Sequence, residues 1–182
     1  MKTSGLYNKS QIIKQPDVML LFSYLNFNFD KDVYAINWDY YEQMCESSSS
    51  LSFAPHSICA ADNNRMLSAY NYLLDSAMVD INDIFNCGWQ GIHSGSAAGA
   101  WYAVFRGIGG IVCREDCIEI NPHMIPWWKN LTFSFIYRGI RFSVNVSDNT
   151  YSIKSDSSKD VKVIFKGKEF IINSENEVRE LL

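Results

Sequence analysis

The spacing of apolar residues changes near residue 110 of this chain. Before that point apolar positions recur at helical spacing, and after it they alternate with polar ones, which is typical of β-strands. A first helix is predicted to begin at Pro16, because proline suits a first helical turn and Asp17 complements the helix dipole there. Apolar residues surround this helix almost completely, so we expect burial on most of its sides. Asn26 and Asn28 are expected to end it.

The same spacing predicts further helices over 37–44, 56–61 and 65–79. Asn63 or Asn64 is the expected cap of the last of these. Four serines, Ser47 to Ser50, separate the first two. Their composition is typical of a flexible loop, but a polar loop between apolar segments often lines a site.

A glycine-rich stretch from Gly88 to Gly110 follows a polar linker. Its first half is predicted to be a loop that contains His93, and its second half a helix over about 97–106, which the glycines up to Gly110 end. Small residues before a helix leave backbone N–H groups open, and the positive end of the helix dipole favours an anion there. We therefore expect an anion pocket that suits phosphate. The alternative is an ordinary helix start, with His93 hydrogen-bonded in the wall of a core.

Beyond residue 110 the alternation predicts short strands joined by tight turns. The expected strands lie in a hairpin over 110–120, then at 131–137, 140–146, 151–154, 161–165 and 169–172. In one of them Ile140, Phe142, Val144 and Val146 share a face. Such strands are typical of a small antiparallel sandwich or jelly roll. The fold class is thus α+β, with helices over 1–110 followed by strands over 111–182.

Charge and cysteine content exclude several functions. The net charge is −4 with no basic stripe, so no nucleic-acid partner is expected. Five cysteines without framework spacing indicate free thiols in a reducing compartment. Cys113 and Cys117 lack a second pair at zinc spacing, so neither a metal site nor another cofactor is expected. No signal peptide or membrane-spanning run is visible, which makes the cytoplasm the expected location and a membrane partner unexpected.

The motifs in order resemble glycoside hydrolase family 65, the family of maltose, trehalose and kojibiose phosphorylases. The likeness covers about residues 10 to 172, and a combination of short motifs carries it. These are Lys14-Gln15-Pro16-Asp17-Val18, Tyr40-Tyr41-Glu42, Ser49-Ser50-Leu51-Ser52, His56-Ser57-Ile58, Gly91-Ile92-His93, Ala98-Gly99-Ala100-Trp101, Gly107-Ile108-Gly109-Gly110, Asn121-Pro122 and Tyr137-Arg138-Gly139. Each motif is weak alone, and their order and spacing make the set specific.

The resemblance implies a fold and a set of roles. The helices would be the closing helices of an (α/α)6 barrel, and the strands the β-sandwich that follows it. Lys14 and Gln15 match positions that hydrogen-bond the glucosyl unit. Ser49, Ser50 and His93 match positions that hold phosphate, in agreement with the anion pocket. The co-substrate would be inorganic phosphate, and the substrate a disaccharide.

The implied reaction is inverting phosphorolysis of an α-glucoside to glucose 1-phosphate. A carboxylic acid protonates the leaving oxygen while phosphate attacks the opposite face of the sugar, where an inverting hydrolase would place an activated water. The family's acid is a glutamate upstream of the segment at Lys14, so no catalytic residue is assigned in this chain. We therefore expect the chain to be inactive alone. A second chain supplying the rest of the barrel, or a homodimer, is a possible partner.

The pattern departs from the family at one point, which leaves alternatives open. The family has a histidine two positions before the serine pair, where this chain has Ser47, and Glu46 lies beside it. A carboxylate there is compatible with a hydrolase that activates water in place of phosphate. A third alternative is a non-catalytic remnant that at most binds sugar or phosphate.

Overall fold

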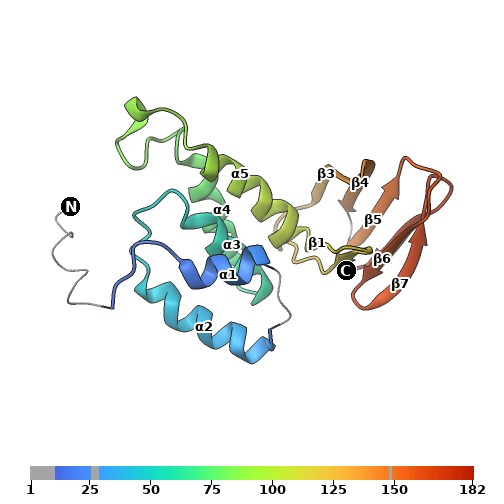
Figure 1. The fold of residues 1–182 in the computed structure, drawn as a ribbon, viewed down its shortest axis with the longest axis horizontal. Helices are drawn as coiled ribbons and strands as arrows, with labels where there is room; N and C mark the ends of the chain where they lie inside the picture. The colour runs from blue at the N-terminus through green and yellow to red at the C-terminus, as the bar shows by residue number, and fades with distance from the viewer. Residues whose placement is uncertain (1–10, 26–28, 148) are drawn as a thin grey trace. The chain divides into compact units, whose positions relative to one another are not determined.

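The computed structural model describes residues 11–25, 29–147 and 149–182, and its fold is α+β (Figure 1). The chain divides into two compact units, Met1–Ile108 and Gly109–Leu182. The first unit is helical and the second consists of strands. None of the helices in the described ranges is long and apolar enough to cross a membrane.

The helical unit is built around one short, fully covered helix. Its helices are α1 (Asp17–Leu25), α2 (Lys31–Met44), α3 (Phe53–Asp62), α4 (Met66–Met78) and α5 (Ser94–Tyr102), with a 3₁₀ turn, η2 (Gly88–Gln90), before α5. Every residue of α3 from Phe53 to Ala61 is buried, and the other four helices pack against it. The short buried helix predicted over 56–61 is therefore confirmed.

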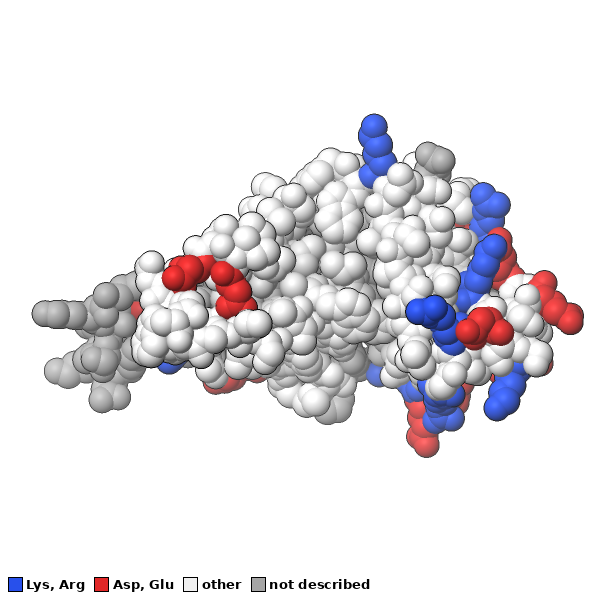
Figure 2. Space-filling view, turned by 90° about the horizontal axis from the view of Figure 1, so that it is seen from above, with Lys and Arg blue, Asp and Glu red and all other residues white. Residues whose placement is uncertain are grey.

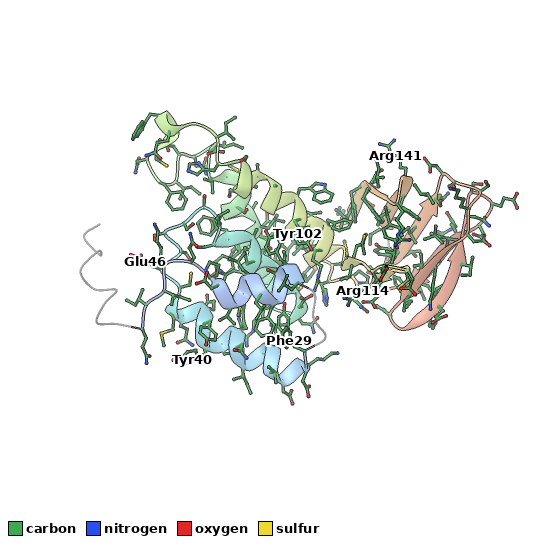
Figure 3. All side chains as sticks on the ribbon, viewed as in Figure 1. Phe29, Tyr40, Glu46, Tyr102, Arg114 and Arg141 are labelled. Carbon is green, nitrogen blue, oxygen red and sulfur yellow. The ribbon has the colours of Figure 1, made fainter. Side chains whose placement is uncertain are left out.

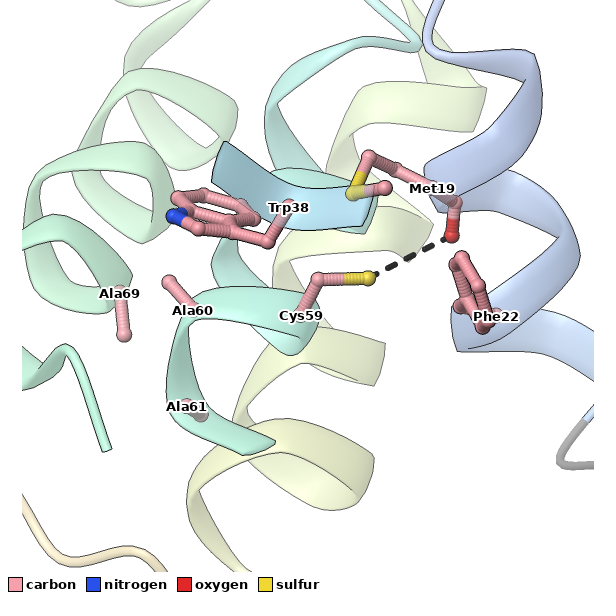
Figure 4. Packing of buried hydrophobic residues seen from close by; sticks show 7 residues of the cluster. All are labelled: Met19, Phe22, Trp38, Cys59, Ala60, Ala61 and Ala69. Atoms are coloured by element: carbon pink, nitrogen blue, oxygen red, sulfur yellow. Dashed lines mark hydrogen bonds between the residues drawn. The ribbon is translucent and has the colours of Figure 1, made fainter. Parts of the chain in front are cut away.

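Small residues allow the helices to approach α3 closely. Figure 4 shows the cluster formed by Met19 and Phe22 of α1, Trp38 of α2, Cys59, Ala60 and Ala61 of α3, and Ala69 of α4. The Cys59 thiol donates a hydrogen bond of 3.5 Å to the Met19 carbonyl. This contact satisfies a polar group within an otherwise apolar core.

The prediction that α1 is buried on most of its sides is wrong. Only Met19, Phe22 and Ser23 are buried, whereas Leu21 and Leu25 are exposed. Within the described residues α1 packs mainly against α3 and α2, and near its end the Tyr24 ring stacks on the Tyr102 ring of α5 at 5.1 Å. The predicted asparagine cap is also wrong, because Arg65 holds the N-cap position of α4.

The two asparagines end α3 instead. The Asn63 side chain donates to the Cys59 carbonyl at 2.8 Å, and Asn64 has a φ of 57°. Asparagine tolerates this left-handed conformation, which reverses the chain within one turn. Three helices begin earlier than predicted: α2 begins at Lys31, α3 at Phe53 and α5 at Ser94.

A π-helical turn, η3 (Ala103–Ile108), continues α5. At Gly107 a Cβ would lie 3.3 Å from the Ile58 Cα, so the backbones of η3 and α3 are in close contact. Arg106 on the same turn pairs with Asp62 at the end of α3. The glycine and the ion pair thus hold η3 against the central helix.

The strand unit contains two four-stranded sheets. Its strands are β1 (Ile111–Cys113), β2 (Cys117–Ile120), β3 (Asn130–Tyr137), β4 (Ile140–Ser147), β5 (Thr150–Ser155), β6 (Val161–Phe165), β7 (Lys168–Ile172) and β8 (Glu177–Leu181). The orders are β1-β2-β6-β7 and β3-β4-β5-β8. The Tyr151 and Phe165 rings, one from each sheet, lie 5.3 Å apart in the core between the sheets.

The predicted strands are all present, with two differences. Strands β2 and β6 pair in parallel, so the unit is not purely antiparallel. Strand β8 was not predicted, because of its side chains only Val178 is buried and the alternation is weak. It pairs with β5 at the edge of its sheet. The predicted inward face of β4 is confirmed, since Phe142, Val144 and Val146 are buried.

Candidate functional site

The segment with Lys14 and Gln15 lies beside the segment that leads into the serine loop. Ile13 and Cys45 form a parallel bridge, in which the Ile13 N–H donates to the Met44 carbonyl and the Glu46 N–H to the Ile13 carbonyl, each at 2.9 Å. The side chains of Lys14 and Gln15 are exposed, just before α1. Two of the predicted binding segments are therefore neighbours, although they are about thirty residues apart in the sequence.

The serine loop is a folded turn, not a free coil. The Ser52 N–H donates to the Ser49 carbonyl at 2.9 Å, and the Leu51 N–H donates to the Ser49 hydroxyl at 3.4 Å. The Ser48 hydroxyl donates to a Glu46 carboxylate oxygen at 3.0 Å. The hydroxyls of Ser49 and Ser50 belong to half-buried residues at this turn.

The first turn of α5 contacts the residue that follows the serine pair. A Cβ on Gly95 would lie 2.8 Å from Cδ2 of Leu51, the far end of a flexible side chain, so the two segments are in close contact. The Phe85 ring lies 6.1 Å from that of Phe53 and 6.3 Å from that of His93. His93 and the serine loop thus lie at the same end of the helical unit. Glu46 marks that end in Figure 3.

His93 is held in a fixed orientation by Asp80. The His93 N–H donates to Oδ2 of Asp80 at 2.9 Å, and Nδ1 of the ring lies 2.6 Å from Oδ1. The hydrogen bond from the imidazole is the main reason that the pKa of Asp80 lies below its ordinary value. Because a carboxylate only accepts, Nδ1 carries the proton and Nε2 is left for another partner. His93 is half-buried at the start of α5, not enclosed in a core.

Most of the backbone N–H groups at the start of α5, which were predicted to be open to a ligand, donate hydrogen bonds within the protein. The N–H groups of Ser94 and Ser96 donate to the carbonyls of Ile92 and His93 at 3.0 and 2.9 Å. Among the described residues, the Gly95 N–H has no acceptor. An anion here would meet one free amide and the imidazole, and the serine hydroxyls lie on the neighbouring turn. No hydrogen bond within the described ranges joins His93 to Ser49 or Ser50.

Sequence reasoning missed two groups near these segments. Asp80 lies 13 residues before His93 in the polar linker, and no local pattern indicates that the two meet. His56 and Ser52 on the first turns of α3 are buried, and His56 Nε2 and the Ser52 hydroxyl have no partner among the described residues. The sequence signals for them were the motifs Ser49-Ser50-Leu51-Ser52 and His56-Ser57-Ile58, to which no role was assigned at Ser52 or His56.

Comparison with known families matches both units. Residues 3–102 match the glycosyl hydrolase family 65 central catalytic domain. Residues 111–172 match the glycosyl hydrolase family 65 C-terminal domain. The two matches meet near the place where the structure changes from helices to strands.

Curated relatives align over almost the whole chain. The 3-O-alpha-D-glucosyl-L-rhamnose phosphorylase of Lachnoclostridium phytofermentans is 54% identical over 93% of the chain and 22% of its own length. The kojibiose phosphorylase of Caldanaerobacter subterraneus is 32% identical over 90% of the chain and 21% of its own length. The alpha,alpha-trehalose phosphorylase of Thermoanaerobacter brockii is 32% identical over 89% of the chain. The chain therefore spans about a fifth of the length of these relatives.

A solved structure shares the fold. It is described as a candidate kojibiose phosphorylase from the human microbiome, and it matches all of this chain and 28% of its own with a TM-score of 0.87 at 24% identity. Together with the two domain matches, these comparisons show that the chain belongs to glycosyl hydrolase family 65.

Proposed function

We propose that this chain supplies the phosphate-binding and glucosyl-binding part of the active site of an inverting disaccharide phosphorylase. The observation that carries the proposal is the meeting of three segments at one end of the helical unit. Lys14 and Gln15 lie beside the serine loop, and the start of α5 packs on that loop. The named relatives, all phosphorylases, support the same reaction class.

The proposed roles follow from hydrogen-bonding capacity. With Nδ1 bound to Asp80, a protonated His93 presents an Nε2–H donor to a phosphate oxygen, and Asp80 stabilises the positive ring. The hydroxyls of Ser49 and Ser50 and the Gly95 amide add neutral donors. The exposed Lys14 and Gln15 bind sugar hydroxyls. Phosphate is itself the nucleophile, so this part of the site holds and orients it without a catalytic base.

The acid that protonates the leaving oxygen is expected in the upstream part of the family's catalytic domain. We therefore propose that these 182 residues do not turn over disaccharide by themselves. Complementation by a chain that supplies the remaining helices would restore the reaction. A hydrolase in which Glu46 activates water is the competing proposal, and Glu46 is half-buried beside the loop with a hydrogen bond from Ser48.

Phosphate binding tests the first part. Titration with inorganic phosphate, followed by tryptophan fluorescence and calorimetry, should give saturable binding. The variant His93→Ala should weaken it at least about tenfold, because a hydrogen bond to a charged group contributes about 1.5–3 kcal/mol. His123→Ala in the strand unit is the matched control and should bind like the wild type. Binding that is absent, or equal in both variants, contradicts the proposal.

An activity assay tests the reaction class. The chain is mixed with the upstream segment of the relative that is 54% identical, and 3-O-α-D-glucosyl-L-rhamnose and phosphate are added. Kojibiose and trehalose are run in parallel. Glucose 1-phosphate should appear only in the mixture and only with phosphate. Release of free glucose without phosphate would instead support the hydrolase.

A further inference from the structure

The side chains of Cys87, His93 and Asp80, all from the segment before α5, form a continuous chain of contacts. Sγ of Cys87 lies 3.5 Å from Nε2 of His93, and Nδ1 of the same ring lies 2.6 Å from Oδ1 of Asp80. Cys87 is half-buried, so a small reagent has access to the thiol. A nucleophile next to a base, with the base oriented by a third group, is the arrangement that activates nucleophiles in many proteins.

The hydrogen-bond directions fit activation of the thiol. The Asp80 carboxylate accepts from Nδ1, so a neutral His93 turns the lone pair of Nε2 toward Cys87. Transfer of the thiol proton to Nε2 would place the imidazolium between two anions, the Asp80 carboxylate and the thiolate. No three His, Cys, Asp or Glu side chains of the described residues form a group that could hold a metal ion.

One further charge faces this thiol. Oδ1 of Asp83 accepts from the backbone N–H groups of Cys87 and Gly88, each at 2.8 Å. This carboxylate opposes a negative charge on the sulfur, whereas the His93 ring favours it. The imidazole contacts the sulfur directly, while Asp83 binds only the backbone, so we expect the imidazole to have the larger effect.

We propose that Cys87 is an activated nucleophilic thiol, a modification site for small electrophiles and peroxides that the His93–Asp80 pair creates. No hydrogen bond joins any other described cysteine to an imidazole: the sulfur of Cys45, for example, has the Ser47 hydroxyl and the Lys14 carbonyl as its hydrogen-bond partners. This inference does not rest on the proposed phosphorylase function, although both use Nε2 of His93: the ring accepts from the thiol when it is neutral, and it donates to phosphate when it is protonated.

Two reactions are expected. With iodoacetamide, an S–C bond forms, the C–I bond breaks, iodide leaves, and the thiol proton passes through His93 to solvent. With hydrogen peroxide, an S–O bond forms and the O–O bond breaks. The sulfur loses two electrons to give a sulfenic acid, and the departing hydroxide takes the proton to leave water.

Site-resolved alkylation tests the proposal. The whole chain is treated with limiting iodoacetamide at about pH 6.5, and each cysteine is quantified by peptide mass spectrometry. Cys87 should react at least about fivefold faster than Cys45, its half-buried control, since thiolate content dominates the rate. The buried Cys59 and Cys117 should stay unmodified. In concentrated urea all five should react alike.

Variants separate activation from simple exposure. His93→Gln and Asp80→Asn should slow Cys87 to the rate of Cys45 without changing Cys45, and Asp83→Asn should speed Cys87. Equal rates for Cys87 and Cys45 in the wild type would overturn the proposal, as would a Cys87 rate unchanged in His93→Gln. Rapid modification of Cys59 in native buffer would also overturn it, because the described geometry would then not exist in solution.

Discussion

At the residue scale, His56 is a neutral imidazole enclosed by aromatic rings. Its Nδ1 lies 2.7 Å from the Ser52 carbonyl, so Nδ1 is the donor and Nε2 holds an unpartnered lone pair. The Tyr72 ring stacks on it at 4.9 Å. Burial is the main cause of the lowered pKa of His56, and it outweighs the Ser52 carbonyl and Glu42, which act in the opposite direction. Protonation would place an unpaired cation in the core.

This gives a pH dependence of known sign. In the unfolded chain His56 takes up a proton near pH 6.5, and in the folded chain only at lower pH. Between these two pKa values the unfolded state binds more protons than the folded state. The contribution of neutral His56 to stability is therefore complete above the unfolded pKa, and it is lost as the pH falls toward the folded pKa. Urea unfolding should therefore show lower stability at pH 5.5 than at pH 7.5, by at most about 1.4 kcal/mol, because pH 5.5 lies about one unit below the unfolded pKa. His56→Phe should flatten this dependence, and an unchanged slope would contradict the assignment.

A second residue-scale prediction concerns the ion pair of Arg106 and Asp62. The guanidinium bonds both carboxylate oxygens at 2.9 Å, and the side chains are only 11% and 16% exposed. Asp62→Ala leaves the buried Arg106 charge without its carboxylate partner. It should lower the free energy of unfolding in urea by about 3–5 kcal/mol. Asp39→Ala is the control, since Asp39 pairs with Arg65 at 56% and 45% exposure and should cost less than about 1 kcal/mol. Equal losses would show that burial of the pair is unimportant.

At the element scale, the packing of α5 depends on two glycines with different surroundings. At Gly99 a Cβ would lie 2.6 Å from the Ala54 Cβ of α3, a buried residue on the central helix. At Gly95 the corresponding neighbour, at 2.8 Å, is the tip of the flexible Leu51 side chain, which is 45% exposed. The contact at Gly99 is therefore with a rigid helix, whereas the contact at Gly95 is with a side chain that can move.

The matched pair Gly99→Ala and Gly95→Ala tests this packing. Alanine favours a helix over glycine by about 1 kcal/mol, so Gly95→Ala should be near neutral or stabilising. Gly99→Ala should instead lower the free energy of unfolding by about 1–3 kcal/mol, because α3 and α5 must separate. Thermal unfolding followed by circular dichroism measures both. A stabilised Gly99→Ala variant would be inconsistent with the described contact between α3 and α5.

At the scale of the whole molecule, the two units differ in how completely they cover their apolar side chains. The strand unit buries a core between its sheets, and its surface carries many charges (Figure 2). The helical unit leaves large apolar side chains exposed, among them Leu21, Leu25, Val33, Ile36 and Leu67. Lysine and arginine are sparse on the face of this unit that Figure 2 shows. Uncovered apolar surface of this kind favours association.

Self-association is therefore expected through the helical unit. Sedimentation velocity of the wild type should show a sedimentation coefficient that increases with concentration. The double variant Ile36→Lys and Leu67→Lys should reduce this increase, because both side chains are about two-thirds exposed, at 67% and 64%. Ile136→Lys in the strand unit, exposed to 71%, should leave it unchanged. A monomer at all concentrations would contradict the expectation.

Local patterns were sufficient for most elements. The alternation in β4, the glycine turns between strands and the apolar run of α3 each depend on residues close in sequence, and the structure confirms them. The candidate site was accessible only through motifs. Asp80, the partner of His93, could not be predicted, because its position depends on how the linker before α5 folds. The proposed ligand roles of Lys14, Gln15, Ser49, Ser50 and His93 stay predictions.

The sequence by itself determined the family resemblance, the change from helices to strands near residue 110, and most of the strands and turns, because steric and hydrogen-bonding preferences act over a few residues. The tertiary structure alone decided which face of α1 is covered, the parallel pairing of β2 with β6, and the alignment of Asp80, His93 and Cys87. Each of these depends on segments distant in sequence, whose contacts are fixed only when the chain packs.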